Sequence, residues 1–229
     1  MTKPPSRWGP SWSRWVGRFL ARVYWNTEVH GRDNIPKHGS VLVLANHIGL
    51  PDGPVVHGVI PRPSHFLIKA AMMKGPLGLV LRPAGQISVE GAGRDALSKA
   101  MAVLERGGVV GVFPEGHRGG GHAQETYGGA AWLAVRSGAA IVPTAVVGTR
   151  RAGESVSHWP RPRRRMVVAF GEASHLDVPA ALAGRSRQEW AAREVGRMLQ
   201  AHVYETLTRT DLTMPDGNAL PAESEDGHE

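Results

Sequence analysis

Residues 41–52 of the chain read VLVLANHIGLPD, an apolar run of Val and Leu that ends in Asn46-His47. A short Val- and Leu-rich run that is bounded by turn residues is typical of a buried β-strand. Gly49 and Pro51 then turn the chain before Asp52, five positions after the histidine. The stretch therefore predicts a buried strand that delivers a histidine to its end, with a carboxylate close behind it.

Two interpretations of His47 and Asp52 follow from this spacing. An imidazole can accept a proton near neutral pH, and a carboxylate on its far ring nitrogen fixes the tautomer and stabilises the imidazolium. The pair would then be a general base with its orienting group. Alternatively, His47 only ends the strand, and Asp52 is the N-cap of a helix for which Asp-Gly-Pro is a favourable start.

Short apolar strands alternate with helical patterns along the rest of the chain. This alternation predicts a single α/β domain with a mixed, largely parallel central sheet flanked by helices. Strands are expected at His65–Ile68, Gln86–Val89, Val109–Phe113, Ala140–Val147 and Met166–Phe170. Helices are expected at Ala71–Leu81, Arg94–Glu105, Tyr127–Ser137 and Arg187–Leu207. The predicted organisation is an N-terminal helix within 1–30, the α/β domain at 31–210, and a disordered acidic tail at 211–229.

The N-terminal segment has the pattern of a basic amphipathic helix. Its apolar positions recur at helical spacing, and its arginines recur every fourth residue on another face. The apolar face includes Trp12, Trp15 and Phe19, and the basic face includes Arg14, Arg18 and Arg22. Two interpretations stay open: the apolar face packs onto the domain, or it lies in a membrane interface, where Trp and Arg are both favoured.

The composition limits the possible partners and compartments. The chain has 229 residues, no cysteine and a formal net charge of +7, which favours anionic partners such as a phospholipid surface or a phosphorylated substrate. Nucleic acid is not expected, because no binding motif accompanies the charge. No apolar run approaches the ~18 residues of a membrane-spanning helix. Arginines also interrupt the N-terminal segment, so it lacks the continuous apolar core of a secretory signal. No metal site is expected, because the histidines lack paired spacing.

A second polar loop follows the strand predicted at Val109–Phe113. It reads Pro114-Glu115-Gly116-His117-Arg118 and continues into glycines that let a ligand approach the backbone. Parallel strands present such loops at a common edge of the sheet, where ligands collect. We therefore expect this loop to face the loop that carries His47.

These segments together resemble the glycerolipid acyltransferases, a family that includes the 1-acylglycerol-3-phosphate acyltransferases. Asn46-His47 with Asp52 is similar to the Asn-His-x-x-x-x-Asp motif of the family, and residues 112–118 are similar to its Phe-Pro-Glu-Gly-Thr-Arg motif. Residues 141–145, followed by Gly148, are similar to its late Val-Pro strand. The resemblance covers about residues 31–149 and favours the catalytic interpretation of His47.

The resemblance implies roles for the motif residues. His47 would remove a proton from an acceptor hydroxyl while Asp52 orients it, and the oxygen would attack an acyl thioester. Asn46, Glu115, Gly116 and Arg118 would bind substrate, with Arg118 suited to a phosphate. Lys69 matches a lysine that is common after the preceding strand of the family, although an exposed lysine at a strand end is an equally simple interpretation.

The chain also departs from the family pattern. Gly91 stands where the family has an arginine that helps to bind the acceptor phosphate, His117 replaces the usual Thr, and Tyr127 lies near where many members have a lysine. Arg94 either substitutes for the missing arginine from the first turn of its helix or is a surface residue. Because of these departures, the resemblance does not decide which lipid is the acceptor.

The expected function is transfer of a fatty acyl group from acyl-coenzyme A or acyl carrier protein to the hydroxyl of a lysophospholipid such as 1-acyl-glycerol-3-phosphate, in phospholipid biosynthesis. The thioester is a donor substrate, and no cofactor is expected. The expected location is cytoplasmic, attached peripherally to the inner face of the membrane. Two alternatives remain: the same chemistry on an acceptor without a phosphomonoester, and a non-catalytic membrane protein that binds lipid.

Overall fold

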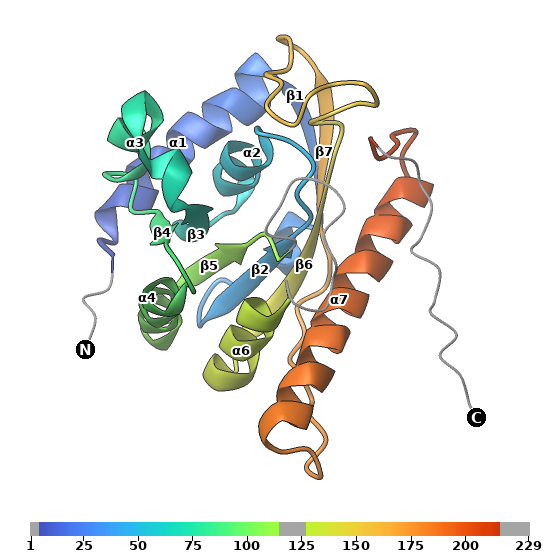
Figure 1. Cartoon of the computed structure of the whole chain (residues 1–229). Coiled ribbons are helices and arrows are strands. Elements are labelled where there is room, and N and C mark those ends of the chain that lie inside the picture. Colours follow the sequence, from blue (N-terminus) through green and yellow to red (C-terminus); the bar gives the residue numbers. More distant parts are fainter. Residues whose placement is uncertain (1–4, 115–126, 216–229) are drawn as a thin grey trace.

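A seven-stranded sheet forms the centre of the molecule in the computed structural model, which describes residues 5–114 and 127–215 (Figure 1). The strand order is β1-β7-β6-β2-β5-β3-β4. All neighbouring strands are parallel except β6 and β7. The strands are β1 (Asn26–His30), β2 (Val41–Ala45), β3 (Ser64–Lys69), β4 (Ile87–Val89), β5 (Val109–Val112), β6 (Ala140–Val147) and β7 (Arg165–Phe170). The prediction of a mixed, largely parallel sheet is confirmed.

Helices cover both faces of the sheet (Figure 1). They are α1 (Trp8–Phe19), α2 (Asp52–Val59), α3 (Gly75–Leu81), α4 (Arg94–Glu105), α6 (Gly128–Ser137) and α7 (Gly184–Thr208). Alternate residues of β2 divide between the two layers, as the two-residue period of a strand requires. Leu42 and Leu44 pack with α4, α6 and α7, whereas Val41, Val43 and Ala45 pack with α2 and the segment after α1. A strand that is buried on both faces explains the continuous apolar run.

Two segments differ from the sequence-based prediction. Residues 26–30, which were placed with the N-terminal helix, form strand β1 and pair with β7, so the boundary predicted after residue 30 separates one strand from its own sheet. The helix predicted at Ala71–Leu81 is broken, because Lys74 is extended and Gly75 has a φ of +63°. A 3-10 turn at Ala70–Met73 precedes the break, and α3 follows it.

The N-terminal helix packs with its small residues toward the protein. Gly9, Ser13 and Gly17 of α1 are buried, and so is Ala21 in the π-helical turn Leu20–Tyr24 that continues it. The large apolar side chains of the same segment face outward and are exposed: Trp8, Trp15, Val16, Phe19 and Val23. Trp12 and Leu20 are half-buried, and Leu20 packs against the core. The first of the two interpretations, in which the whole apolar face packs onto the domain, is therefore wrong for the exposed residues of that face.

No helix in the described part of the chain is both long enough and apolar enough to cross a membrane.

Candidate active site

The sheet brings the ends of three neighbouring parallel strands to one edge. In the register of β2, Leu44 pairs with Val112 of β5, and Ala45 pairs with Thr144 of β6. The chain therefore leaves β2 at Asn46-His47 beside the segment that leaves β5. Ligands of open parallel sheets bind at this carboxyl edge, since the connecting loops meet there.

The imidazole of His47 is held by the carboxylate of Asp52. Nδ1 of His47 lies 2.8 Å from Oδ2 of Asp52. A carboxylate can only accept, so Nδ1 carries the hydrogen and donates it, which leaves Nε2 as the acceptor nitrogen of the neutral ring. The His47 side chain keeps 16% of its surface exposed, whereas Asp52 is fully buried. The carboxylate thus orients the ring from its Nδ1 side, and part of the His47 side chain stays accessible.

The Asp52 carboxylate is directed back to the loop before it and away from its own helix. Its Oδ2 also accepts hydrogen bonds from the backbone N–H groups of Ile48 (2.7 Å) and Gly49 (2.8 Å). Asp52 is the first residue of α2, Pro51 occupies the N-cap position, and no side chain caps this helix. The alternative in which Asp52 serves as a helix N-cap is therefore wrong, because its oxygens close the turn that carries His47.

Sequence reasoning missed two residues that complete this cluster, Thr149 and Arg150, which follow β6. The hydroxyl of Thr149 donates a hydrogen bond of 2.5 Å to Oδ1 of Asp52, and both side chains are fully buried. Nε of Arg150 donates to the carbonyl oxygen of Ile48 at 2.6 Å. The available signal was that β6, like β2 and β5, ends in a polar turn at the same edge of the sheet.

Phe113, the first residue after β5, forms one wall beside the imidazole. Its ring stacks on His47 with the ring centroids 4.4 Å apart and the planes at 24°. It also leans on Phe66 of β3, with centroids 5.5 Å apart. Stacking against a ring that is itself packed limits rotation of His47 about its hydrogen bond to Asp52.

Asn46, predicted to bind substrate, joins two strands. It is 2% exposed. Its amide nitrogen donates to the carbonyl oxygen of Val146, and its amide oxygen accepts from the N–H of the same residue. This double hydrogen bond ties the end of β2 to β6 and so fixes the direction in which His47 leaves the sheet. Its contact with the substrate stays a prediction.

The remaining predicted binding residues fall into two groups. Lys69 is the exposed last residue of β3, and Arg94 is the exposed first residue of α4. Lys69 ends β3 and Arg94 comes after β4, so both lie toward the carboxyl ends of parallel strands. Their roles stay predictions. Glu115, Gly116 and Arg118 lie outside the described residues, as does His117.

Tyr127 has a place that the family comparison did not anticipate. It is 4% exposed and belongs to the core between α6 and α7. A Cβ placed on Gly196 of α7 would lie 3.5 Å from the Tyr127 ring. The tyrosine is therefore a packing residue of the core.

These contacts define a chemical capacity. A neutral imidazole with Nδ1–H bound to a buried carboxylate can take a proton at Nε2 and be stabilised as the imidazolium. The arrangement is that of a general base with its orienting group. In the described ranges, no cluster of three or more His, Asp or Glu residues could hold a metal ion.

Comparison with known proteins places most of the region that carries this site in a family. The family model described as Acyltransferase matches residues 26–147, more than half of the chain. A protein named 1-acyl-sn-glycerol-3-phosphate acyltransferase from Borreliella burgdorferi is 32% identical over 127 residues, which are 53% of this chain and 51% of that protein. An uncharacterized protein of Mycobacterium tuberculosis is 34% identical over 149 residues, 58% of this chain and 40% of that protein.

The chain thus spans about half or less of the length of these curated relatives. Its fold is similar to the crystal structure of the 1-acyl-sn-glycerophosphate acyltransferase from Thermotoga maritima, with a TM-score of 0.67 over 88% of this chain and 80% of that one. At 21% identity this similarity concerns the fold alone. With the family model spanning β1 to β6 and the His47–Asp52 pair inside it, the chain belongs to the acyltransferase family.

Proposed function

We propose that the protein transfers a fatty acyl group from an acyl thioester to the hydroxyl of a lysophospholipid. The observation that carries this proposal is the pair His47 and Asp52, bonded at 2.8 Å at the carboxyl edge of the sheet, within the region that matches the family. The donor is acyl-coenzyme A or acyl carrier protein, and the reaction needs no other cofactor.

The proposed step uses His47 as a general base and then as a general acid. Nε2 takes the proton of the acceptor hydroxyl while the oxygen attacks the thioester carbonyl, and Asp52 stabilises the imidazolium that forms. Collapse of the tetrahedral intermediate breaks the C–S bond, and the imidazolium returns its proton to the departing thiolate. The products are an ester and a free thiol, and the enzyme regains its starting protonation.

The favoured acceptor is a lysophospholipid with a phosphomonoester, such as 1-acyl-glycerol-3-phosphate. Its support is the similarity to the Borreliella protein of that name, together with the cations Lys69 and Arg94 near the carboxyl edge and Arg118 in the second motif. Bidentate recognition by arginine suits a phosphate.

A second candidate acceptor, without a phosphomonoester, is supported by Gly91. This residue is exposed, and its φ of +51° is one that side-chain-bearing residues rarely adopt. The chain thus has no arginine at the position where the family has one, and its backbone conformation there is one that favours glycine. Tyr127, a core residue near where many members of the family have a lysine, is a second departure from the family pattern.

The proposed reaction takes place at a membrane surface to which α1 attaches. Support comes from its exposed Trp15 (56%) and Phe19 (57%), with exposed Arg18 and Arg22 on the same helical segment. Arg14 does not contribute in the same way, because its guanidinium donates to the carbonyl oxygen of Pro61 at 2.7 Å. Each basic residue near an anionic surface adds about 1 kcal/mol, so attachment is expected to be reversible.

An acyl-transfer assay tests the proposal. Purified protein is given acyl-coenzyme A or acyl carrier protein and a panel of lysophosphatidate, lysophosphatidylcholine and monoacylglycerol, with release of free thiol as the signal. We expect thiol release only when an acceptor is present, and none from His47→Ala. Preference for lysophosphatidate supports the first acceptor, and preference for a neutral or zwitterionic lipid supports the second. If thiol release with enzyme equals the release without enzyme, for every acceptor on the panel and for both donors, the protein would instead be a non-catalytic lipid-binding protein.

A further inference from the structure

Helix α3 has the same inverted packing as α1. Its inward position is Gly78, which is buried so closely that an added Cβ would overlap the backbone of Met73. Its large apolar side chains face outward: Leu77 is 45% exposed, Leu79 78% and Val80 48%. A surface helix of a water-soluble domain normally buries its apolar stripe and exposes its polar one. In α3 the arrangement is reversed.

The outward face of α3 is held in a fixed relation to that of α1. A Cβ on Gly9, in the first turn of α1, would lie 2.5–2.7 Å from backbone atoms of Pro83, Ala84 and Gly85, the turn that follows α3. Trp8, next to Gly9, is 76% exposed. Figure 1 shows α3 beside the N-terminal part of α1 on the same side of the molecule. The start of α1 is therefore packed directly against the turn that ends α3.

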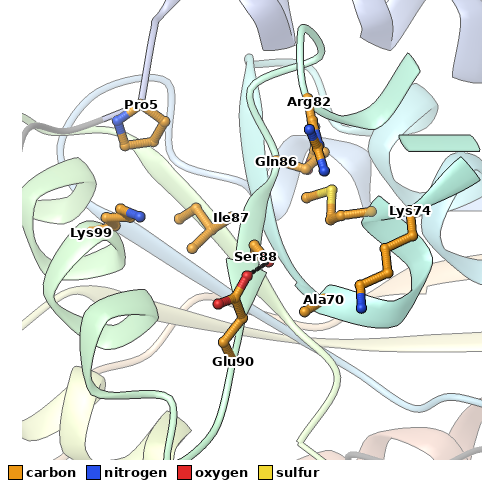
Figure 2. A pocket seen from close by; sticks show the side chains of 10 residues that line it. Pro5, Ala70, Lys74, Arg82, Gln86, Ile87, Ser88, Glu90 and Lys99 are labelled. Atoms are coloured by element: carbon orange, nitrogen blue, oxygen red, sulfur yellow. Dashed lines mark hydrogen bonds between the residues drawn. The ribbon is translucent and has the colours of Figure 1, made fainter. Parts of the chain in front are cut away.

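Basic side chains flank α3. Lys74 precedes it and Arg82 follows it, and both are exposed. They line a cavity of about 320 Å³ between the start of α1 and the edge strand β4, which also includes Pro5, Lys99 and Glu90 (Figure 2). Lys99 is already paired with Asp95. An exposed apolar face bordered by Lys and Arg matches the chemistry of a bilayer, with apolar chains below a layer of anionic headgroups.

We propose that α3 is a second membrane-contact element, which inserts Leu77, Leu79 and Val80 into the interface while Lys74 and Arg82 bind the phosphates of anionic lipids. The inference rests on the proposed action of the protein at a membrane surface and adds a contact to that of α1. Two contacts joined at Gly9 fix the orientation of the domain on the bilayer, which one helix alone does not.

The absence of native cysteine makes a direct test possible. Leu79→Cys, Phe19→Cys and Tyr204→Cys are each labelled with an environment-sensitive fluorophore, which reports burial in lipid by a blue shift. Tyr204 is the matched control, because it is 46% exposed on α7, another helix. The full chain is mixed with vesicles of phosphatidylcholine, with or without phosphatidylglycerol, and no thioester is added.

We expect labels at positions 79 and 19 to shift to the blue on vesicles with phosphatidylglycerol, while the label at 204 does not respond. A response at 19 without one at 79 would overturn the role of α3 and leave the proposed attachment by α1 intact. Silence at both positions would overturn both contacts, whereas acyl transfer is measured separately on dispersed substrates. A blue shift at position 79 that grows with protein concentration in the absence of vesicles would mean that copies of the chain pair through this face. That result would overturn the proposal.

Two further comparisons separate the apolar and the charged contributions. Leu77→Ser with Leu79→Ser is expected to lower vesicle partitioning at least roughly tenfold, since each leucine contributes strongly to transfer out of water. Val156→Ser, which changes an exposed valine outside both helices (39%), is the control and should have little effect. An equal response to vesicles with and without phosphatidylglycerol would overturn the role given to Lys74 and Arg82.

Discussion

Asp52 is the residue on which the candidate site depends most directly. Its buried carboxylate accepts four hydrogen bonds, from His47, from the backbone of Ile48 and Gly49, and from Thr149. A buried charge without partners would be very costly, and four donors satisfy it. The same bonds that solvate Asp52 fix the turn and the histidine, so the geometry of the base is set before any substrate binds.

Replacement of His47 should abolish turnover and leave the fold intact. We expect His47→Gln to lower kcat by about 10²- to 10⁴-fold, the usual contribution of a general base. The side chain is partly exposed, so loss of the ring should cost little stability. Single-turnover measurement of thiol release, with circular dichroism as the control for folding, checks this. Activity within a few-fold of the original would exclude His47 as the base.

Thr149 should act on the reaction through Asp52. Thr149→Val keeps the shape of this fully buried side chain and removes the hydrogen bond to the carboxylate. Hydrogen bonds to charged groups contribute about 1.5–3 kcal/mol, so we expect kcat to fall by roughly 10- to 100-fold. Thr149→Ser, which keeps the hydroxyl, should restore most of it.

Steady-state kinetics on the two Thr149 variants distinguishes positioning from substrate binding. A positioning role lowers kcat with little change in KM, because the hydroxyl touches Asp52 and not the substrate. Equal activity of the valine and serine variants would show that the hydrogen bond is not needed.

Among the elements, α2 connects the site to the outer helix. It begins at Asp52, and its last turns contact α1 through Gly58, whose added Cβ would meet the Gly17 backbone at 2.1 Å. Two glycines thus allow the helices to approach at backbone distance. An eight-residue helix between the orienting carboxylate and the proposed membrane helix leaves little room for one to move without the other.

This contact predicts a steric effect on stability. Gly58→Ala must separate α1 from α2, and overpacking of this kind costs about 1–3 kcal/mol. For a chain of this size that corresponds to a fall in Tm of roughly 2–12 °C. Gly53→Ala in the same helix is the control, because an added Cβ meets nothing within 4 Å and alanine favours the helix. Thermal unfolding followed by circular dichroism compares the two, and equal Tm values would contradict the close approach.

Elements whose hydrophobic pattern fits only a helix or only a strand were predicted correctly from the sequence. The bounds of α4 and β6 were those predicted, and the ends of β2 and β5 were placed correctly at one edge. The strand β1, NTEVH, was missed because its polar residues suit an edge strand and lack the apolar run of a buried one. Amphipathic spacing located α1 but could not tell which side faces inward, since that depends on a partner. The small residues Gly9, Ser13, Gly17 and Ala21, four apart, were the signal that was overlooked.

The cluster around Asp52 could be predicted only in part for a similar reason. His47 and Asp52 are five residues apart, so a turn suffices to join them, whereas Thr149 is 97 residues from Asp52. Contact over that separation depends on β6 lying next to β2, an order that alternating strands and helices do not specify. The strand order of the sheet is therefore the information that completes the site.

At the scale of the whole molecule, a buried polar network joins the outer helix to the core. His57 on α2 lies 2.9 Å from Ser13 on α1 and 2.9 Å from Ser64 on β3. Burial, with the nearby charges of His65 and Arg14, lowers the pKa of His57 from 6.5 to about 4. The neutral ring donates to one serine and accepts from the other, so protonation removes an acceptor inside the protein.

This network predicts how global stability depends on pH. Because the pKa of His57 is lower in the folded protein than in the unfolded chain, the unfolded chain binds more protons between pH 6.5 and 4. The free energy of unfolding should therefore fall by up to about 3 kcal/mol as the pH is lowered through that window. The Arg164 hydrogen bond lowers the pKa of Glu154 to about 2, so its contribution is lost only below pH 4.5. Urea unfolding at a series of pH values should show this fall in the free energy of unfolding between pH 6.5 and 4 in the unmodified protein. The fall should be smaller in His57→Gln and unchanged in His38→Gln, which replaces an exposed histidine. An unchanged step in His57→Gln would place the pH dependence elsewhere, with His65, whose pKa burial also lowers, as the next group to replace.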